Sequence, residues 1–208
     1  MQWLRSVGHT HTAFAAECFI DELAGLAQRD PYQFRRGLLQ KQARHLGVLD
    51  LAAEKAGWGK PLPKGMGRGI AVHFSFGSYS AHVAEVSATD GKVRVHRMVC
   101  AIDCGRYVNP GIIAAQIEGG AIFGASAALY QELTFDKGRL QQTNFHSFPV
   151  MRINESPQIE THIVENNEKS GGIGEPGVPC AAPAIANAVF AVTGKRIRRL
   201  PIRLTEAV

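Results

Sequence analysis

A glycine-rich stretch, residues 170–179, holds one acidic residue, Glu175. Its sequence, SGGIGEPGVP, precedes a run of small residues that predicts a helix. Glycines permit positive φ angles and unpaired backbone N–H groups, so such a loop could hold an anion, with Glu175 as a general base. The Gly-Lys-Ser/Thr and GxGxxG patterns of phosphate loops do not occur in it. By itself, however, a Gly-Glu-Pro turn is more often a plain turn than an active site.

A second stretch with chemical potential is the run 112–129, in which nearly every residue is apolar or small. This composition predicts a helix that is buried on every side. Gln116 would lie about one turn from its start, where a buried amide needs partners and could reach a ligand. Close approach of another backbone, or of a flat ligand, is permitted by Gly119, Gly120 and Gly124. A core helix with a satisfied Gln is the simpler alternative.

The third stretch is Trp3–His11, near the start of the chain. His9 and His11 stand two residues apart, as some metal ligands do, but no third ligand is evident nearby, so we assign no metal ligand. Arg5 and the apolar pair Trp3-Leu4 stand at the very start of the chain, whereas such residues are expected inside a domain. We therefore expect the chain to be cut from something larger.

The composition is that of an ordinary folded chain. Of 208 residues, 45% are hydrophobic and 20% charged, which excludes intrinsic disorder. The net charge of +5 is local, because the last fourteen positions hold five basic residues: Lys195, Arg196, Arg198, Arg199 and Arg203. These alternate with apolar residues over 197–204, which predicts an amphipathic closing strand and argues against a nucleic-acid partner.

Several other classes are also disfavoured. The four cysteines form no CxxC pair, so neither a zinc ribbon nor an iron–sulfur site is supported, and buried thiols are expected. No stretch approaches the roughly 18 uninterrupted apolar residues of a membrane span, and no secretion signal is present. The chain itself holds no signal that chooses between the periplasm and the cytoplasmic face.

Residues 1–57 have a helical pattern. The first helix is expected to bury one apolar face, formed by Ala16, Phe19, Leu23 and Leu26. Asp30 followed by Pro31 predicts the capped start of a second helix, and a third, over 46–56, should end at Gly57. Residues 58–69 are expected to be a loop or linker.

Residues 70–208 mix both kinds of element. Strands are expected over 69–77, 80–88 and 92–102 in an antiparallel sheet, with Asp90-Gly91 as a hairpin turn. Asn109-Pro110 predicts the start of a helix that runs to about residue 131. A hairpin turn at 136–138, a strand over 158–165 and a helix over 181–192 follow. Helices and strands without regular βαβ alternation indicate an α+β fold.

The sequence strings combine into one ordered pattern: Trp3–Gly8, Ala101-Ile102-Asp103-Cys104-Gly105, Asn109-Pro110, Gln116-Ile117-Glu118-Gly119 and Gly172-Ile173-Gly174-Glu175-Pro176. In this order they resemble the C-terminal part of the molybdenum-binding subunit of the xanthine dehydrogenase and aldehyde oxidase family. The likeness is greater to the bacterial branch of isoquinoline 1-oxidoreductase beta subunits and related aldehyde dehydrogenases. It spans nearly the whole chain.

The resemblance implies roles for particular residues. Glu175 would be the catalytic base. Gln116 would hydrogen-bond the pterin cofactor, Arg5 would lie beside the molybdenum and the substrate, and Gly172 and Gly174 would belong to the cofactor-binding loop. Val7 stands where the family often has a Phe that stacks on an aromatic substrate.

The resemblance also implies a reaction and partners. An aldehyde or N-heterocycle would be hydroxylated with oxygen from water, using molybdenum held by molybdopterin in its cytosine dinucleotide form. Electrons would leave through [2Fe–2S] clusters on a small iron–sulfur subunit, with a cytochrome c as an acceptor. A helical segment (1–57) and a molybdopterin-binding region (70–208) would assemble with an N-terminal half of the molybdenum subunit, without which the chain would be an inactive fragment. The alternative is a cofactor-free structural or interaction domain derived from this fold.

Overall fold

The turn at Asp90-Gly91 organises a four-stranded sheet. In the computed structural model, which describes residues 3–204, β2 (Ser78–Thr89) and β3 (Lys92–Asp103) pair antiparallel on either side of it. Asp90 and Gly91 have φ angles of 51° and 75°, as a two-residue hairpin turn requires. β1 (Met66–Ser75) pairs antiparallel with β2, and it starts earlier than predicted, within the expected loop over 58–69. The predicted hairpin is confirmed.

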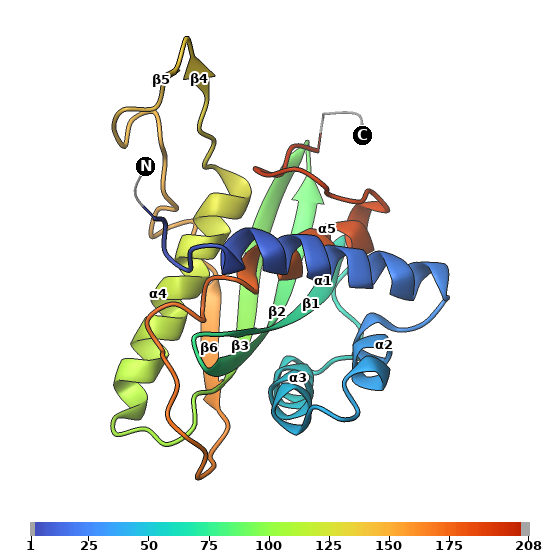
Figure 1. Cartoon of the computed structure of the whole chain (residues 1–208). Helices are drawn as coiled ribbons and strands as arrows, with labels where there is room; N and C mark the ends of the chain where they lie inside the picture. Colours follow the sequence, from blue (N-terminus) through green and yellow to red (C-terminus); the bar gives the residue numbers. More distant parts are fainter. Residues whose placement is uncertain (1–2, 205–208) are drawn as a thin grey trace.

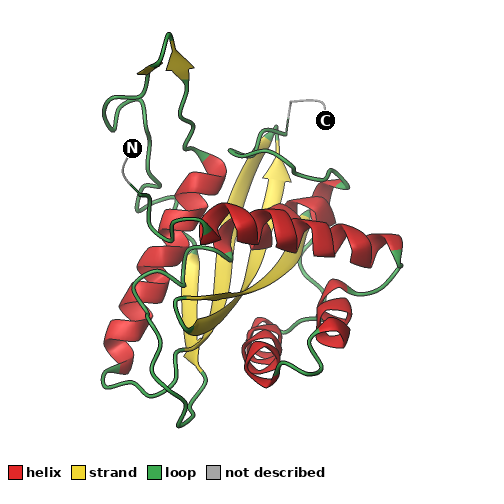
Figure 2. Cartoon of the chain, viewed as in Figure 1, coloured by secondary structure: helices red, strands yellow, loops and turns green. Residues whose placement is uncertain are grey.

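The fourth strand, β6 (Gln158–Ile163), lies beside β3 and runs parallel to it. The strand order is β1-β2-β3-β6, with helices on both sides of the sheet (Figure 2). A separate two-residue hairpin joins β4 (Phe135–Asp136) to β5 (Arg139–Leu140), at the predicted turn. The α+β class is confirmed, and the sheet is mixed because a long connection containing α4 brings β6 back parallel.

One face of the sheet packs against α4 (Pro110–Leu129) and α5 (Ala181–Thr193). Asn109 caps α4 as predicted, since its Oδ1 accepts hydrogen bonds from the N–H groups of Gly111 and Ile112. The prediction that this helix is buried all round is wrong, because Ile112 and Gly119 are exposed along one side. α4 is long and apolar enough to cross a membrane, yet half of its most apolar window is buried inside the structure, as in a core helix.

The other face of the sheet packs against α3 (Ala43–Ala56). The buried side chains of α3 form a hydrophobic cluster with residues of β1, β2 and β3 on this face. Gly57, with φ 64°, ends α3 in the left-handed conformation as predicted. α2 (Pro31–Leu38) begins at Asp30, whose Oδ1 accepts a hydrogen bond from the N–H of Gln33 at 2.9 Å. Both helix boundaries follow from local capping chemistry.

α1 (His9–Leu26) runs across the strands and contacts α5 and β1 (Figure 1). The predicted buried face of this helix is wrong: Phe19 is 60% exposed and Leu26 is 82% exposed. The helix instead buries the side that carries Glu17 and Asp21. The physical reason is that both carboxylates find cations and N–H donors in the interior.

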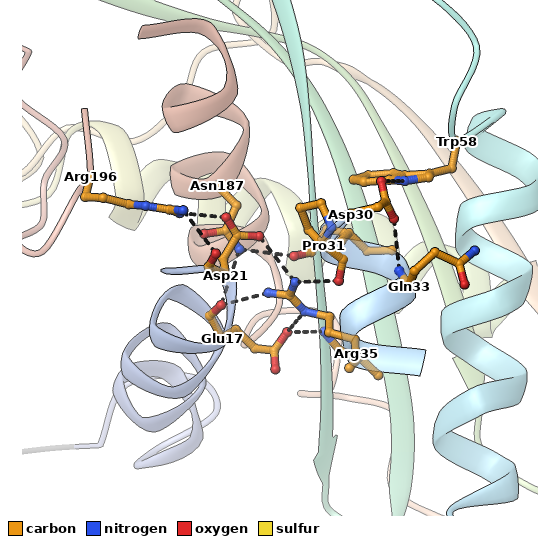
Figure 3. A network of polar contacts seen from close by, with 11 residues as sticks. Glu17, Asp21, Asp30, Pro31, Gln33, Arg35, Trp58, Asn187 and Arg196 are labelled. Carbon is orange, nitrogen blue, oxygen red and sulfur yellow. Dashed lines mark hydrogen bonds and ion pairs between the residues drawn. The ribbon is translucent and has the colours of Figure 1, made fainter. Parts of the chain in front are cut away.

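These carboxylates belong to a buried polar network (Figure 3). Arg35 Nε donates to Glu17 Oε2 at 2.8 Å, and Arg35 Nη1 lies 3.2 Å from Asp21 Oδ1. Glu17 Oε2 also accepts the N–H of Val72, on the outer edge of β1, at 2.9 Å. Arg196 Nη1 donates to Asp21 Oδ2 at 2.6 Å. The network thus joins α1, α2, β1 and the C-terminal segment.

The closing strand expected over 197–204 is absent: residues 195–204 form no strand. The segment passes the C-terminal end of α4, where the N–H of Ile202 donates to the carbonyl of Ala128 at 2.8 Å. Arg196 and Arg198 pair with acidic residues of α1. Two of the basic residues of this segment therefore pair with acidic residues of α1, and the segment does not join the sheet.

Candidate functional site

Arg5 joins two segments that lie far apart in the sequence. Its Nε donates to the carbonyl of Gly174 at 2.8 Å, and its Nη2 donates to Gln116 Oε1 at 2.9 Å. The sequence separations are 169 and 111 residues. The N-terminal segment, the first turns of α4 and the glycine loop before α5 therefore meet at one place.

Glu175 is held at the same place by the residue next to Arg5. The backbone N–H of Ser6 donates to Glu175 Oε1 at 2.9 Å, and the Ser6 hydroxyl donates to the Glu175 carbonyl at 2.7 Å. Ser6 is fully buried, whereas Glu175 is half-buried. Within residues 3–204, the other carboxylate oxygen of Glu175 has no hydrogen-bond partner.

The glycine loop lies directly on the turn between β1 and β2. The N–H of Gly172 donates to the carbonyl of Phe76 at 2.7 Å, and Ser78 Oγ donates to the carbonyl of Gly172 at 2.7 Å. A Cβ on Gly171 would lie 2.3 Å from the carbonyl oxygen of Gly77, so only glycine allows this approach. Both backbone polar groups of Gly172 are thus engaged within the chain, while Gly174 is exposed, with open space where a Cβ would stand.

The Asp-x-Gly string supports the loop from the other side. Asp103 accepts hydrogen bonds from Arg44 Nε at 2.8 Å and from the N–H of Gly105 at 3.0 Å. Although burial of Asp103 opposes it, the hydrogen bonds from Arg44 and Gly105 hold the pKa of Asp103 below its ordinary value. Gly105 has φ 69°, and a Cβ on it would lie 2.3 Å from the carbonyl oxygen of Lys169. Gly105 therefore lets the strand end pack against the beginning of the glycine loop.

The glycines of α4 have two different surroundings. A Cβ on Gly120 would stand 3.0 Å from Gly177, and one on Gly124 would stand 2.8 Å from the carbonyl oxygen of Val178. At Gly119 the nearest such neighbour is Arg5 Nη1, at 3.8 Å. Gly120 and Gly124 thus admit the backbone that follows Glu175, and Gly119 leaves an open surface beside Arg5.

A histidine pair fixes the N-terminal segment to the sheet. His9 Nδ1 lies 3.0 Å from His73 Nε2, and the His9 ring packs edge-on against Phe76 with centroids 5.0 Å apart. Burial, aided by the nearby His9 and His45, lowers the pKa of His73 to about 4, so His73 is neutral at physiological pH. Within the described part of the chain, no group of three His, Cys, Asp or Glu side chains could hold a metal ion.

The groups still free to meet a ligand form a compact set. Within residues 3–204, Arg5 Nη1 and the amide nitrogen of Gln116 have no hydrogen-bond partner, and the same holds for one oxygen of Glu175. Val7, two residues after Arg5 in the sequence, is exposed. A cavity of about 590 Å³ between the β2–β3 hairpin and residues 202–204 is lined by none of these residues. The candidate site is thus a partly open surface at the junction of three segments.

Four residues expected from the sequence to form the site, Arg5, Gln116, Gly174 and Glu175, lie together in the structure, and the contact of Ser6 is not expected from the sequence. Nothing about a serine between Arg5 and Val7 signals its contacts, because its partner lies 169 residues away. The spacing of His9 and His11 in the sequence points only to metal ligation. The structure pairs His9 with His73.

Comparison with known proteins gives a consistent set of relatives. Residues 31–157 match the family model of the molybdopterin cofactor-binding domain. Isoquinoline 1-oxidoreductase subunit beta from Brevundimonas diminuta is 36% identical over 207 residues, covering 97% of this chain and 26% of the relative. The membrane-bound aldehyde dehydrogenase (pyrroloquinoline-quinone) of Gluconacetobacter polyoxogenes is 33% identical, covering 97% of this chain and 29% of the relative. The chain thus spans little more than a quarter of the length of these curated relatives.

The fold has solved counterparts. The aldehyde oxidoreductase of Desulfovibrio gigas superposes with a TM-score of 0.76, covering 95% of this chain and 40% of that chain, at 15% sequence identity. At this identity the likeness shows the fold alone. The family model covers more than half of the residues, and it includes the Asp-x-Gly string and Gln116. On this evidence the chain belongs to the molybdopterin cofactor-binding domain family.

Proposed function

We propose that this chain is the part of a molybdenum hydroxylase subunit that carries the general base, Glu175, and one wall of the cofactor site. The substrate would be an aldehyde or an N-heterocycle, which is hydroxylated with oxygen from water. Relatives named for both substrate types match nearly the whole chain. Because the chain covers about a quarter of their length, the activity is proposed for the assembled protein.

One observation carries the proposal: Arg5, Gln116 and Glu175 lie at one junction despite their separation in the sequence. Two neighbouring residues hold the loop at Glu175: Arg5 binds Gly174, directly before Glu175, and Ser6 binds Glu175 itself. An ordinary turn would need no such arrangement of an arginine, an amide and a carboxylate at a partly open surface.

The free groups fit a pterin. Gln116 keeps its amide N–H groups for a ligand, which suits the oxygen and nitrogen acceptors of a pterin ring. The open surface beside Gly119 and Gly174 admits a flat group at close range. Molybdenum would then be held through the pterin, and not by side chains of this chain. When bound, the group supplies the two-electron oxidation chemistry.

The residues of this chain would do three things. Gln116 donates a hydrogen bond to the pterin and is itself oriented by Arg5. Arg5 presents its remaining N–H groups to the substrate, and Val7 forms part of the substrate surface. Glu175 removes the proton from the attacking water, using the carboxylate oxygen that Ser6 leaves free.

The remaining parts of the assembly are also proposed. Electrons would pass to [2Fe–2S] clusters on a small iron–sulfur subunit and then to a cytochrome c. The pterin would carry a cytosine dinucleotide. An N-terminal half of the molybdenum subunit would supply the opposite wall of the site. The exposed Phe19 and Leu26 on α1, and Ile112 on α4, are surfaces on which further chain could pack.

The test uses the chain within its whole subunit, co-produced with its iron–sulfur partner. Glu175→Gln should lower kcat for aldehyde oxidation with a dye acceptor by about 10²–10⁴-fold, while the molybdenum content stays at the wild-type level. Glu168→Gln is the matched control, because Glu168 lies exposed just ahead of the same loop. Turnover retained in Glu175→Gln would refute the role of Glu175. A correctly assembled wild type that binds no molybdenum would favour the structural or interaction domain.

A further inference from the structure

We propose that Ser6 is a positioning residue that sets the orientation of the Glu175 carboxylate. The inference rests on the proposed function, since it concerns how the base of that reaction is held. It adds a residue to which the resemblance assigns no role.

Ser6 holds Glu175 at both ends. Its N–H fixes the carboxylate through Oε1 at 2.9 Å, and its hydroxyl fixes the backbone of the same residue through the carbonyl at 2.7 Å. Ser6 is fully buried, so both donors are shielded from water on the Ser6 side of these hydrogen bonds. With one oxygen tied and the backbone fixed, the second oxygen of Glu175 has a defined position from which to accept a proton.

The backbone around Ser6 is unfavourable for the residues that form it. The N–H of Val7 donates to the carbonyl of Leu4 at 3.0 Å, which closes a four-residue turn with Ser6 in its third position. Ser6 has φ 74°, where glycine is favoured, and Val7 has φ 49°, which is rare for a β-branched residue. Such conformations persist only where the surroundings hold them, and they gather at functional sites.

The surroundings of the turn supply this support. Arg5 binds the carbonyl of Gly174, directly before Glu175, and the N–H of His9 donates to the carbonyl of Ser6 at 3.0 Å. Thr10 Oγ1 donates to the carbonyl of Arg5 at 3.2 Å. The strained turn is thus tied to α1 on one side and to the glycine loop on the other. A serine in a glycine position is explained if its hydroxyl is needed to hold Glu175.

Two variants separate positioning from a merely structural role. Ser6→Ala removes the hydroxyl and keeps a Cβ at the positive φ. Ser6→Gly removes the hydroxyl and relieves the backbone, so its Tm should stay within about 4 °C of the wild type. If the hydroxyl positions Glu175, both variants should lower kcat by about ten- to a hundredfold with KM nearly unchanged. Thr12→Ala, which deletes an exposed hydroxyl on α1, should leave kcat unaltered.

A second readout needs no cofactor. In the chain alone, the backbone amide proton of residue 6 should resonate downfield in ¹H–¹⁵N NMR spectra, because it donates to a carboxylate. Its signal should move upfield in Glu175→Gln, and also in Ser6→Gly and Ser6→Ala, because loss of the hydroxyl bond to the Glu175 carbonyl lets Glu175 shift and lengthens the N–H···Oε1 hydrogen bond. The signal should not move in Thr12→Ala.

The outcomes are distinguishable. A stable Ser6→Gly variant with wild-type kcat and an unmoved amide signal would overturn the role of Ser6, even if Glu175→Gln is inactive. Full turnover in Glu175→Gln would instead refute the proposed function, whatever the Ser6 variants do. Loss of kcat in Ser6→Gly at unchanged Tm, together with the upfield signal, would support the proposal.

Discussion

Replacing Glu17 by glutamine tests whether the buried polar network stabilises the fold as the structure indicates. The substitution keeps size and one oxygen acceptor, but it removes the charge that faces Arg35 at 2.8 Å. Arg35 is only 1% exposed, and it would keep a single carboxylate, Asp21, which Arg196 also binds. The wild-type network has two carboxylates and two guanidinium groups, so the variant buries one positive charge in excess.

The expected cost follows from this imbalance. Removing one partner of a buried ion pair usually costs about 3–5 kcal/mol, because the other charge stays buried without compensation. The hydrogen bonds that the new amide side chain can still accept, together with the nearby Asp21, place the expected loss at the lower end, about 3 kcal/mol. Since domains of this size have a free energy of unfolding of about 5–15 kcal/mol, the variant should unfold at a clearly lower urea concentration.

Urea denaturation followed by circular dichroism, on the wild type and the variant at neutral pH, measures this difference. Arg36→Gln is the matched control, because Arg36 pairs with Asp50 at 2.9 Å with 49% of its side chain exposed. That exposed pair should be worth no more than about 1 kcal/mol. A loss below about 1 kcal/mol in Glu17→Gln, equal to that in Arg36→Gln, would refute the reasoning.

Two further predictions follow from single buried positions. His82 is fully buried, and among residues 3–204 neither of its ring nitrogens has a hydrogen-bond partner. Burial lowers the pKa of His82 from 6.5 to about 3. Below about pH 6.5 the unfolded chain protonates this histidine while the folded chain keeps it neutral, so the free energy of unfolding falls as the pH falls. The expected loss is about 2 kcal/mol between pH 7 and pH 5. In urea titrations, His82→Leu should remove this part of the pH dependence. Gly105→Ala should lower the free energy of unfolding by more than about 2 kcal/mol, because Gly105 has φ 69° and a Cβ there would meet the Lys169 carbonyl. The same clash should loosen the glycine loop. If the loop in this variant resists limited proteolysis as well as the wild type does, the prediction is wrong.

Elements with strong local chemistry could be predicted from the sequence. The turn at Asp90-Gly91 depends on two adjacent residues that accept positive φ angles. The helix starts at Asp30 and Asn109 depend on side chains within three residues of the backbone groups that they satisfy. The direction of β6 and the fate of residues 197–204 depend on distant partners. Alternation of apolar and charged residues describes a segment with two faces, and it does not say whether the neighbour is a strand or a helix end.

The candidate site divides in the same way. Arg5, Gln116 and Glu175 are predictable because their strings resemble a family in their order, and not because any spacing predicts that they meet. Their separation of more than a hundred residues leaves no periodic signal. Ser6 has no signal of its own at all, because its importance comes from a backbone φ angle and from burial that only the folded chain has.

The unusual orientation of α1 links the polar network to the site. Hydrophobicity alone would turn Phe19 and Leu26 inward, and this rotation would carry Glu17 away from Arg35 and from the N–H of Val72. The observed rotation is instead the one in which the buried charges are paired, which is the kind of specificity that buried ion pairs can provide. The N-terminus of α1 follows directly after the turn that holds Glu175, so the rotation of the helix also determines where Arg5 and Ser6 leave it. A change at Glu17 should therefore reach Glu175 through the helix, without any contact between the two side chains.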